Sequence, residues 1–298
     1  MTVTRRQFFQ AAAGAALGVA APAAAIEPIK RTGKPLLKLS IAAYSYRQFL
    51  GLNVKPKPTM TLDDFAETAA QLELPAVELT GYYFPETTPE YLARLKGKCT
   101  RLGLDVSGTA VGNNFCVSDP AKLKEQIASV KKWTEHSSLL GSKALRIFAG
   151  NVEKGDTEEK ARGRCIEAIQ ECCDHAAKYG VYMALENHGG IVNTIDQMLD
   201  IVKAVKHDWF GVNWDSGNFH SADPYADLEK LAPYAVNAQI KVEISRAGQK
   251  KEDADLKRKV DILKQSGYRG YVALEYEAAE DPKVAIPRHI ETLRKLIG

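Results

Sequence analysis

The sequence has little excess charge of either sign. Its 40 lysines and arginines nearly balance 37 aspartates and glutamates, so the formal net charge is +3 and the isoelectric point is near 8.4. Short basic clusters such as Lys257-Arg258-Lys259 are typical of an exposed helix face. Proteins that bind nucleic acid usually concentrate basic residues on one surface. The composition therefore predicts no nucleic-acid partner and no other strongly acidic partner.

Cysteine is scarce as well. The five cysteines are odd in number, and three of them (Cys165, Cys172 and Cys173) fall in one predicted helix at spacings that match no zinc motif. We therefore expect buried thiols rather than a structural zinc site.

The sequence also lacks the pattern G-x-G-x-x-G after any predicted strand. Open parallel sheets that bind dinucleotides carry this pattern at their first turn. Its absence argues against an open dinucleotide-binding sheet, which is the structural alternative to a closed barrel.

The first 25 residues differ from the rest of the chain. An arginine pair (Arg5-Arg6) precedes an apolar stretch that runs to Ala25. That stretch is shorter than the ~20 residues that a membrane-spanning helix needs. Ala23 and Ala25 are placed for an A-x-A cleavage site, and the arginine pair resembles the twin-arginine export signal of bacteria. We expect residues 1–25 to be a twin-arginine-type signal peptide, with a periplasmic or secreted location and no membrane span.

From residue 36 onward, short apolar or β-branched runs alternate with stretches of helical periodicity. We predict strands at 38–45, 76–79, 105–110, 144–148, 181–186, 211–215, 238–242 and 271–275. We predict helices at 61–72, 91–102, 121–140, 158–179, 195–205, 226–235, 253–265 and 282–296. Glycines such as Gly141 and Gly180 stand where these helices end. One unit recurs about every 33 residues, which suits a strand and its crossover helix. Eight uninterrupted units predict an α/β protein with one domain over 36–298, a (β/α)8 TIM barrel.

Acidic residues end several of the predicted strands. In such a barrel the active site lies at the carboxyl ends of the strands. Strands 5, 6 and 8 end at Glu186, Asp215 and Glu275, and strand 7 carries Gln239. A buried carboxylate is costly unless it is paired or bound to a metal. Lys241 is the nearest cation on a strand, and one lysine cannot neutralise three carboxylates. A divalent cation can, so the pattern indicates a metal site.

Three motifs at these strand ends resemble the xylose-isomerase-like, sugar phosphate isomerase/epimerase barrels. They are Ala184-Leu185-Glu186-Asn187-His188, residues 211–215 followed by Ser216-Gly217, and Ala273-Leu274-Glu275. The resemblance covers residues 36–298. It implies that a Glu, an Asp, a His and a Glu on strands 5 to 8 hold a divalent metal ion. It also implies that the two glutamates, which are Glu186 and Glu275 here, form the acid/base pair on either face of the substrate.

Two positions depart from the family pattern. Gln239 stands where the family has its strand-7 histidine, and Asn218 stands where many members end a D-x-x-H motif. Gln239 can still offer an amide oxygen, so the implied ligands are all oxygens, from Glu186, Asp215, Gln239 and Glu275. Such a site favours one Mn²⁺ ion, with Mg²⁺ or Co²⁺ as alternatives. The loss of both histidines, in a chain with only six, argues against the multi-zinc nuclease of the same superfamily.

Further residues near the predicted mouth are candidates for binding the substrate. They are Glu78, Arg146, His188, His220 and Lys241. For the two histidines the alternative is a purely structural role. For Arg146 and Lys241 the alternative is a salt bridge to the acidic cluster. Trp214 and Phe219 flank Asp215 and would either stack on a sugar or pack in the core.

The resemblance implies a metal-dependent sugar isomerase or epimerase that abstracts a proton next to a carbonyl group, through an enediolate. The expected partner is a small sugar or sugar derivative. The same first step followed by loss of a β-leaving group would make the enzyme a keto-glycoside lyase. Loss of catalysis would leave a periplasmic sugar-binding protein. The residues do not separate these alternatives, and they do not name the sugar.

Overall fold

The computed structural model describes residues 26–51 and 57–298. Eight strands close into a barrel in the order β1-β10-β7-β6-β5-β4-β3-β2, and every neighbouring pair is parallel. The barrel strands are β1 (Leu36–Ala42), β2 (Ala76–Thr80), β3 (Asp105–Ala110), β4 (Ala144–Ile147), β5 (Tyr182–Glu186), β6 (Phe210–Asp215), β7 (Ala235–Ile240) and β10 (Arg269–Leu274). The predicted (β/α)8 barrel is confirmed.

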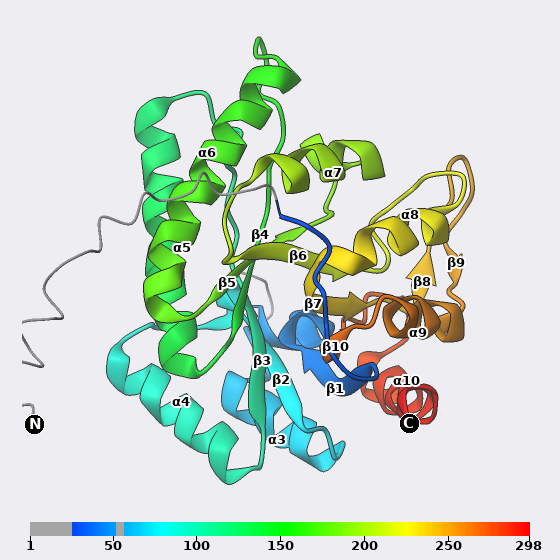
Figure 1. Cartoon of the computed structure of the whole chain (residues 1–298). Helices are drawn as coiled ribbons and strands as arrows, with labels where there is room; N and C mark the ends of the chain where they lie inside the picture. The colour runs from blue at the N-terminus through cyan, green and yellow to red at the C-terminus, as the bar shows by residue number, and fades with distance from the viewer. Residues whose placement is uncertain (1–25, 52–56) are drawn as a thin grey trace, which may run out of the picture.

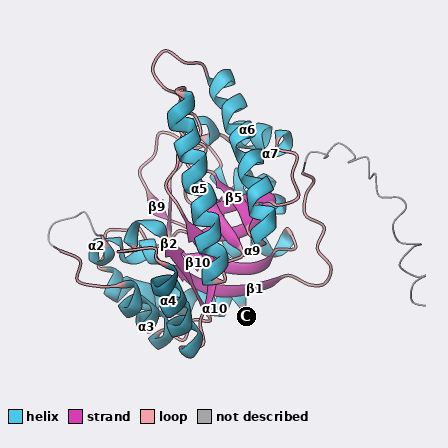
Figure 2. Cartoon of the chain, turned by 90° about the vertical axis from the view of Figure 1, so that its left-hand side faces the viewer, coloured by secondary structure: helices cyan, strands magenta, loops and turns pink. Residues whose placement is uncertain are grey.

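Helices surround the barrel on its outside (Figures 1 and 2). They are α2 (Arg47–Leu50), α3 (Leu62–Gln71), α4 (Pro89–Arg101), α5 (Pro120–Leu140), α6 (Glu158–Ala176), α7 (Ile195–Ala204), α8 (Pro224–Leu231), α9 (Leu256–Gln265) and α10 (Pro282–Ile297). A short antiparallel pair, β8 (Glu243–Ile244) and β9 (Glu252–Asp253), lies between β7 and α9. This pair takes the residues that were predicted to begin the helix at 253.

Local sequence signals set where the helices begin and end. A capping box between Thr61 and Asp64 begins α3, because each side chain accepts a hydrogen bond from the other residue's backbone N–H. Gly141 ends α5 with a φ of 87°, and Gly180 precedes β5 with a φ of 66°. Glycine takes this left-handed conformation without the steric cost that a Cβ would bring.

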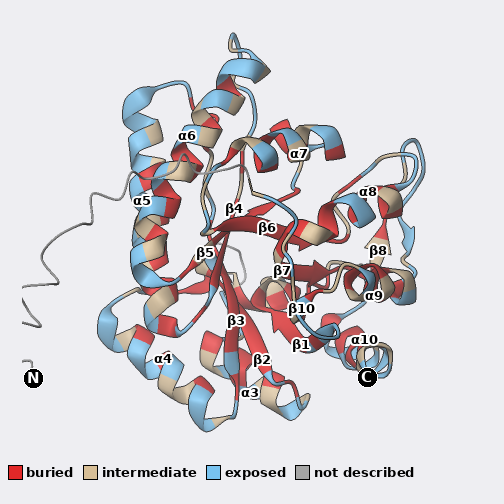
Figure 3. Ribbon diagram, in the orientation of Figure 1, coloured by how far each residue is buried: buried red, intermediate tan, exposed pale blue. Residues whose placement is uncertain are grey.

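The core lies between the strands and the inner faces of the helices (Figure 3). All six residues of β6 are buried, as expected for parallel strands covered on both faces. α3 buries Leu62, Phe65, Ala66 and Ala69, whose spacing follows one face of a helix. The five cysteines of the chain are all buried free thiols, as predicted.

Four barrel strands, β1, β4, β7 and β10, end earlier than predicted. β7 ends at Ile240, because the N–H of Lys241 donates to the Ser216 hydroxyl at 2.8 Å instead of to a neighbouring strand. β10 ends at Leu274, so Glu275 also stands directly after its strand. Lys241 and Glu275 therefore belong to the loops at the barrel mouth.

The predicted signal peptide, residues 1–25, lies outside the described residues. Within residues 26–51 and 57–298, no helix is long and apolar enough to cross a membrane.

Candidate active site

A cavity of about 230 Å³ opens at the carboxyl ends of the barrel strands. It is lined by Tyr44, Tyr82, Arg146, Phe148, Glu186, His188, Lys241, Glu275 and Glu277. A second cavity of about 170 Å³ shares Lys241 and Glu277 with the first. The fold thus brings five of the predicted site residues to one cavity, where three glutamates meet the basic side chains of Arg146 and Lys241.

Arg146, on β4, forms a buried ion pair with Glu186 at the end of β5. The Arg146 Nε atom lies 3.0 Å from a Glu186 carboxylate oxygen, and both side chains are about 5% exposed or less. The guanidinium also stacks over the Phe148 ring, with its central carbon 3.9 Å from the ring centroid. Arg146 therefore takes the structural role named as its alternative, pairing with the acidic cluster, while it still lines the cavity.

Asn218, in the loop after β6, holds the other oxygen of Glu186. Its amide nitrogen donates to Glu186 Oε1 at 2.9 Å, and its amide oxygen accepts from the Lys241 ammonium at 3.0 Å. Asn218 thus links the catalytic candidate on β5 to the cation after β7, and both Glu186 oxygens have partners within the protein.

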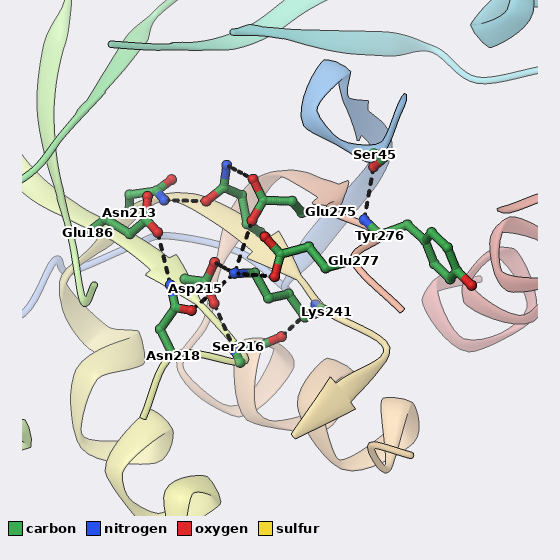
Figure 4. Close-up of polar contacts among 12 residues, drawn as sticks. Ser45, Glu186, Asn213, Asp215, Ser216, Asn218, Lys241, Glu275, Tyr276 and Glu277 are labelled. Carbon is green, nitrogen blue, oxygen red and sulfur yellow. Dashed lines mark hydrogen bonds and ion pairs between the residues drawn. The ribbon is translucent and has the colours of Figure 1, made fainter. Parts of the chain in front are cut away.

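Lys241 lies at the centre of the acidic cluster (Figure 4). Its ammonium nitrogen lies 3.2 Å from an oxygen of Asp215 and 3.3 Å from an oxygen of Glu275. A third carboxylate, from Glu277, lies at 3.2 Å. Of the three carboxylates that the sequence set against this lysine, Asp215 and Glu275 contact it, whereas Glu186 pairs with Arg146 and Glu277 takes the third place.

Gln239 lies one layer deeper in the barrel, in a network of buried polar side chains. Its amide oxygen accepts from the Asn213 amide at 2.6 Å. Its amide nitrogen donates to Glu78 at 2.5 Å and approaches Glu275 at 3.5 Å. The other Glu78 oxygen accepts from Asn237 at 2.8 Å. Glu78 is fully buried in this network and does not line the cavity, so the structure does not place it where it could contact a substrate as predicted.

Burial and neighbouring charges shift the ionisation of the cavity residues. Burial raises the pKa of Glu186 to about 7, because desolvation and the neighbouring Asp215 outweigh the attraction of Arg146. Burial also raises the pKa of Glu275 well above its usual range, although Lys241 opposes the shift. Burial alone would lower the pKa of Lys241, but the surrounding carboxylates raise it well above its usual range. Lys241 is therefore a charged ammonium at neutral pH.

The four predicted metal ligands do not fit a metal ion in this arrangement. Glu186 is engaged by Arg146 and Asn218, and Gln239 has its amide oxygen on Asn213. Asp215 and Glu275 are bridged by an ammonium, as described above. Within the described part of the chain, no group of three or more histidine, cysteine, aspartate or glutamate side chains is arranged to hold a metal. The predicted Mn²⁺ site therefore stays a prediction.

The two predicted histidines lie at different cavities. His188 is exposed, lines the larger cavity and packs against Phe148, with ring centroids 4.6 Å apart. His220 is exposed and lines the smaller cavity. Trp214 and Phe219 are at most 1% exposed, which identifies them as core residues and excludes the sugar-stacking wall.

Sequence reasoning did not assign Tyr44, Tyr82 or Glu277 to the site. Tyr82 follows β2, and Tyr44 follows β1. Glu277 stands two residues after Glu275, so side-chain alternation along an extended segment could have found it. The hydroxyl of Ser45 holds this segment, because it accepts from the Tyr276 N–H (Figure 4) and donates to the Leu274 carbonyl, both at 2.9 Å.

Comparison with known proteins shows which family has this barrel. The family model described as xylose isomerase-like TIM barrel matches residues 66–296. The chain belongs to the xylose isomerase-like TIM-barrel family. An inosose isomerase from Bacillus velezensis is 28% identical over 192 residues, which cover 59% of this chain and 69% of that protein. Homologues of the chain are thus sugar isomerases.

Solved structures share the fold. An IOLI protein with a bound zinc atom is 22% identical, with a TM-score of 0.68 over 87% of this chain and 96% of that one. D-psicose 3-epimerase in the presence of D-fructose is 16% identical, with a TM-score of 0.68 over 87% and 96%. A xylose isomerase-like barrel from Mycobacterium smegmatis in complex with magnesium is 16% identical, with a TM-score of 0.68 over 89% and 96%. Divalent metals therefore occur in proteins with this fold.

Proposed function

We propose that this protein is a sugar isomerase or epimerase that moves a proton next to a carbonyl group, with Glu186 and Glu275 as its acid/base pair. One observation carries the proposal: two buried glutamates, one at the end of β5 and one directly after β10, face the same small cavity. β6 and β7 lie between these strands in the barrel order, so the two carboxyl groups reach the cavity from different directions. Family membership and the inosose isomerase relative support the same reaction class.

The cavity suits one small polar molecule. Its volume of about 230 Å³ lies below the range of ~300–1,000 Å³ that is usual for pockets that hold drug-sized ligands. Tyr44, Tyr82 and Phe148 supply aromatic surface, and the charged side chains supply hydrogen-bonding groups. A single sugar or cyclic polyol ketone matches this lining.

The ionisation of the two glutamates supports a division of roles. Glu186, with a pKa of about 7, has a substantial carboxylate fraction at neutral pH and can accept the proton from the substrate carbon. Burial also raises the pKa of Glu275 well above its usual range, so Glu275 can hold a proton and return it. When Glu186 takes the proton, the C–H electron pair forms a carbon–carbon double bond and the carbonyl oxygen becomes an enolate oxygen. Return of a proton to the opposite face is epimerisation, and return to the neighbouring carbon is isomerisation.

A Mn²⁺ ion, with Mg²⁺ or Co²⁺ as alternatives, would supply charge stabilisation to the enolate if it bound at Glu186, Asp215, Gln239 and Glu275. We derive no step through it, because the side chains in this arrangement do not fit the ion.

Solvent deuterium uptake tests the proposed reaction. The protein is incubated in D₂O with D-psicose, D-fructose and an inosose, and carbon-bound deuterium is measured by mass spectrometry. Wild type should incorporate deuterium into at least one of these compounds. Glu186→Gln and Glu275→Gln keep the side-chain shape but remove the acid/base group, so each should lower the rate by about 10²–10⁴-fold. Glu171→Gln, on the exposed surface of α6, is the matched control and should keep the wild-type rate.

Each other outcome points to a different function. Binding of a sugar without any deuterium uptake would identify a sugar-binding protein and reject the proposal. Deuterium uptake accompanied by release of a leaving group from a keto-glycoside would identify a lyase. Wild-type rates in both glutamate variants would reject the acid/base assignment.

A further inference from the structure

The Lys241 side chain is buried among polar side chains rather than exposed on the surface. Its side chain is only 9% exposed, and its ammonium has four oxygen neighbours, from Asp215, Asn218, Glu275 and Glu277, at 3.0–3.3 Å. An ammonium has three N–H donors, so the oxygens outnumber the donors that can bind them. The site is therefore organised around a positive charge at this point (Figure 4).

The last residue of β6 and the turn after it form this position with four consecutive residues, 215–218. Asp215 pairs with the Lys241 ammonium, and Asn218 accepts a hydrogen bond from it. Ser216 accepts the Lys241 backbone N–H at 2.8 Å. Gly217 leaves room for the side chain, because a Cβ on it would lie 2.7 Å from Lys241 Cδ and 3.0 Å from Lys241 Cβ. Each of these four residues thus accommodates one part of the lysine.

The side chains around Lys241 offer a metal ion no further oxygen ligand from Gln239. Gln239 presents its amide nitrogen, and not its oxygen, to the side of Glu275. The Glu78 carboxylate, deeper in the barrel, fixes this orientation, because it accepts hydrogen bonds and requires a donor from Gln239. A divalent ion among these carboxylates would also lie against the ammonium, and two like charges in a buried site repel strongly.

Lys241 remains within reach of a ligand. It lines both cavities, and one of its acceptors, Glu277, is 25% exposed in the loop after β10. Of the three carboxylates, Glu277 is the most exposed, so its exchange for a substrate oxygen disturbs the buried cluster least.

We propose that the Lys241 ammonium is the resident cation of this site and that it takes the place of a divalent metal ion. The chemical role that we give to the Lys241 ammonium rests on the proposed isomerase or epimerase function. In that reaction one glutamate takes the carbon-bound proton, the electron pair becomes the new double bond, and the carbonyl oxygen gains the negative charge. The Lys241 ammonium donates a hydrogen bond to that oxygen throughout, so the step needs no oxidant, reductant or other reactant.

Calorimetric titration of the full chain with Mn²⁺ and Co²⁺, after treatment with EDTA and dialysis, tests the proposal without any measurement of turnover. Wild type should bind neither ion with a Kd below ~1 mM. Lys241→Met removes the charge but keeps an unbranched side chain, so the freed carboxylates should bind Mn²⁺ at least tenfold more tightly than wild type does. Lys241→Arg keeps the charge and should bind as weakly as wild type.

Gly217→Ala is a second variant that leaves Lys241 in the sequence. Its new Cβ displaces the lysine side chain, so Mn²⁺ affinity should again rise above that of wild type. Gly163→Ala is its control, because a Cβ there meets nothing within 4 Å, and it should titrate as wild type does.

Stoichiometric binding of Mn²⁺ or Co²⁺ by wild type with a micromolar Kd would overturn the proposal, whether or not the variants fold. Folded Lys241→Met that binds Mn²⁺ no better than wild type would overturn it as well. Because these titrations measure no reaction, they can fail while deuterium uptake succeeds, and the reverse also holds. The two proposals are therefore rejected by different results.

Discussion

The buried carboxylate of Glu78 fixes the orientation of the Gln239 side-chain amide. Both of its carboxylate oxygens accept hydrogen bonds from amide nitrogens, one from Gln239 and one from Asn237. If the Gln239 amide turned over, its oxygen would face a carboxylate oxygen, and Asn213 would lose the acceptor for its own amide. A buried polar network of this kind holds its members in one arrangement, because an unsatisfied buried group is costly.

The hydrogen bonds of Gln239 predict the effect of Gln239→His. The substitution restores the residue type that the family pattern has on strand 7, but it disturbs the amide that satisfies both Glu78 and Asn213. We expect the free energy of unfolding to fall by about 1–3 kcal/mol, the cost of leaving a buried polar group without its partner. We also expect the ratio of Co²⁺ to Mn²⁺ affinity to stay unchanged. Urea denaturation and calorimetry measure the two quantities.

Gln265→His, at the exposed end of α9, provides the control and should unfold as wild type does. A Gln239→His protein with undiminished stability and a clear gain in Co²⁺ affinity would show that this residue faces a metal.

Helix α9 is tied to the end of β7 by a buried lysine. The Lys259 ammonium is fully buried and donates to the backbone carbonyl groups of Lys241 at 2.8 Å and of Glu243 at 3.2 Å. These carbonyl groups follow the last residue of β7, so the lysine supports the backbone that carries Lys241. The connection joins two elements at the level of the cavity.

A pH dependence of stability follows from this burial. Desolvation lowers the pKa of Lys259 to about 7 in the folded protein, whereas an unfolded lysine has a pKa of about 10.4. Below pH 7 Lys259 is protonated in both the folded and the unfolded protein, so the folded protein bears the whole free-energy cost of burying the charge. As the pH rises from 7 to about 10.4 the folded state loses its proton first, and the cost is relieved by roughly 4 kcal/mol. Wild type should therefore gain stability relative to Lys259→Met over this range.

Chemical denaturation at several pH values between 6 and ~10 measures the difference. Lys257→Met, with its side chain 71% exposed on the same helix, should show no such trend relative to wild type. A constant difference between wild type and Lys259→Met at all pH values would show that the carbonyl groups keep Lys259 charged.

At the scale of the whole molecule, one barrel end collects all the residues of the candidate site, although they are spread from Tyr44 to Glu277 along the chain. Closure of the eight parallel strands brings their carboxyl ends together. We propose that the segment before the barrel, residues 1–25, directs export of the protein by the twin-arginine route. The arginine pair, the apolar stretch and the alanines at 23 and 25 support this proposal.

The prediction for the whole chain uses the double variant Arg5→Lys, Arg6→Lys. The change conserves charge, so it removes the twin-arginine pair without altering the basic character of the segment. We expect wild type in the periplasmic fraction of a bacterium with this export route and the variant in its cytoplasmic fraction. Lys34→Arg, a conservative change outside the segment, should be exported normally. Equal export of the double variant and wild type would contradict the proposal.

Much of the fold was predictable from the sequence because its signals are local. Alternating apolar runs and helical periodicity predicted all eight barrel strands, and glycine positions predicted helix ends such as Gly141. The carboxyl ends of parallel strands must meet once the barrel closes, so Glu186 and Glu275 could be assigned to one site. The early end of β7 could not be predicted, because the Ser216 hydroxyl that receives the Lys241 N–H comes from another part of the chain.

The sequence by itself determined that Arg146, Glu186, Lys241 and Glu275 meet at the barrel mouth, since they stand near the carboxyl ends of predicted parallel strands. It also placed Glu78 there, which the structure buries below the cavity, and it missed Glu277. Only the tertiary structure decided how those groups pair. Arg146 could have bound a substrate or Glu186, and Lys241 could have faced one carboxylate or three. Pairing depends on distances of a few ångströms between side chains on different strands, and electrostatic energy in a buried site changes steeply over such distances. Periodicity along one chain carries no information about those distances.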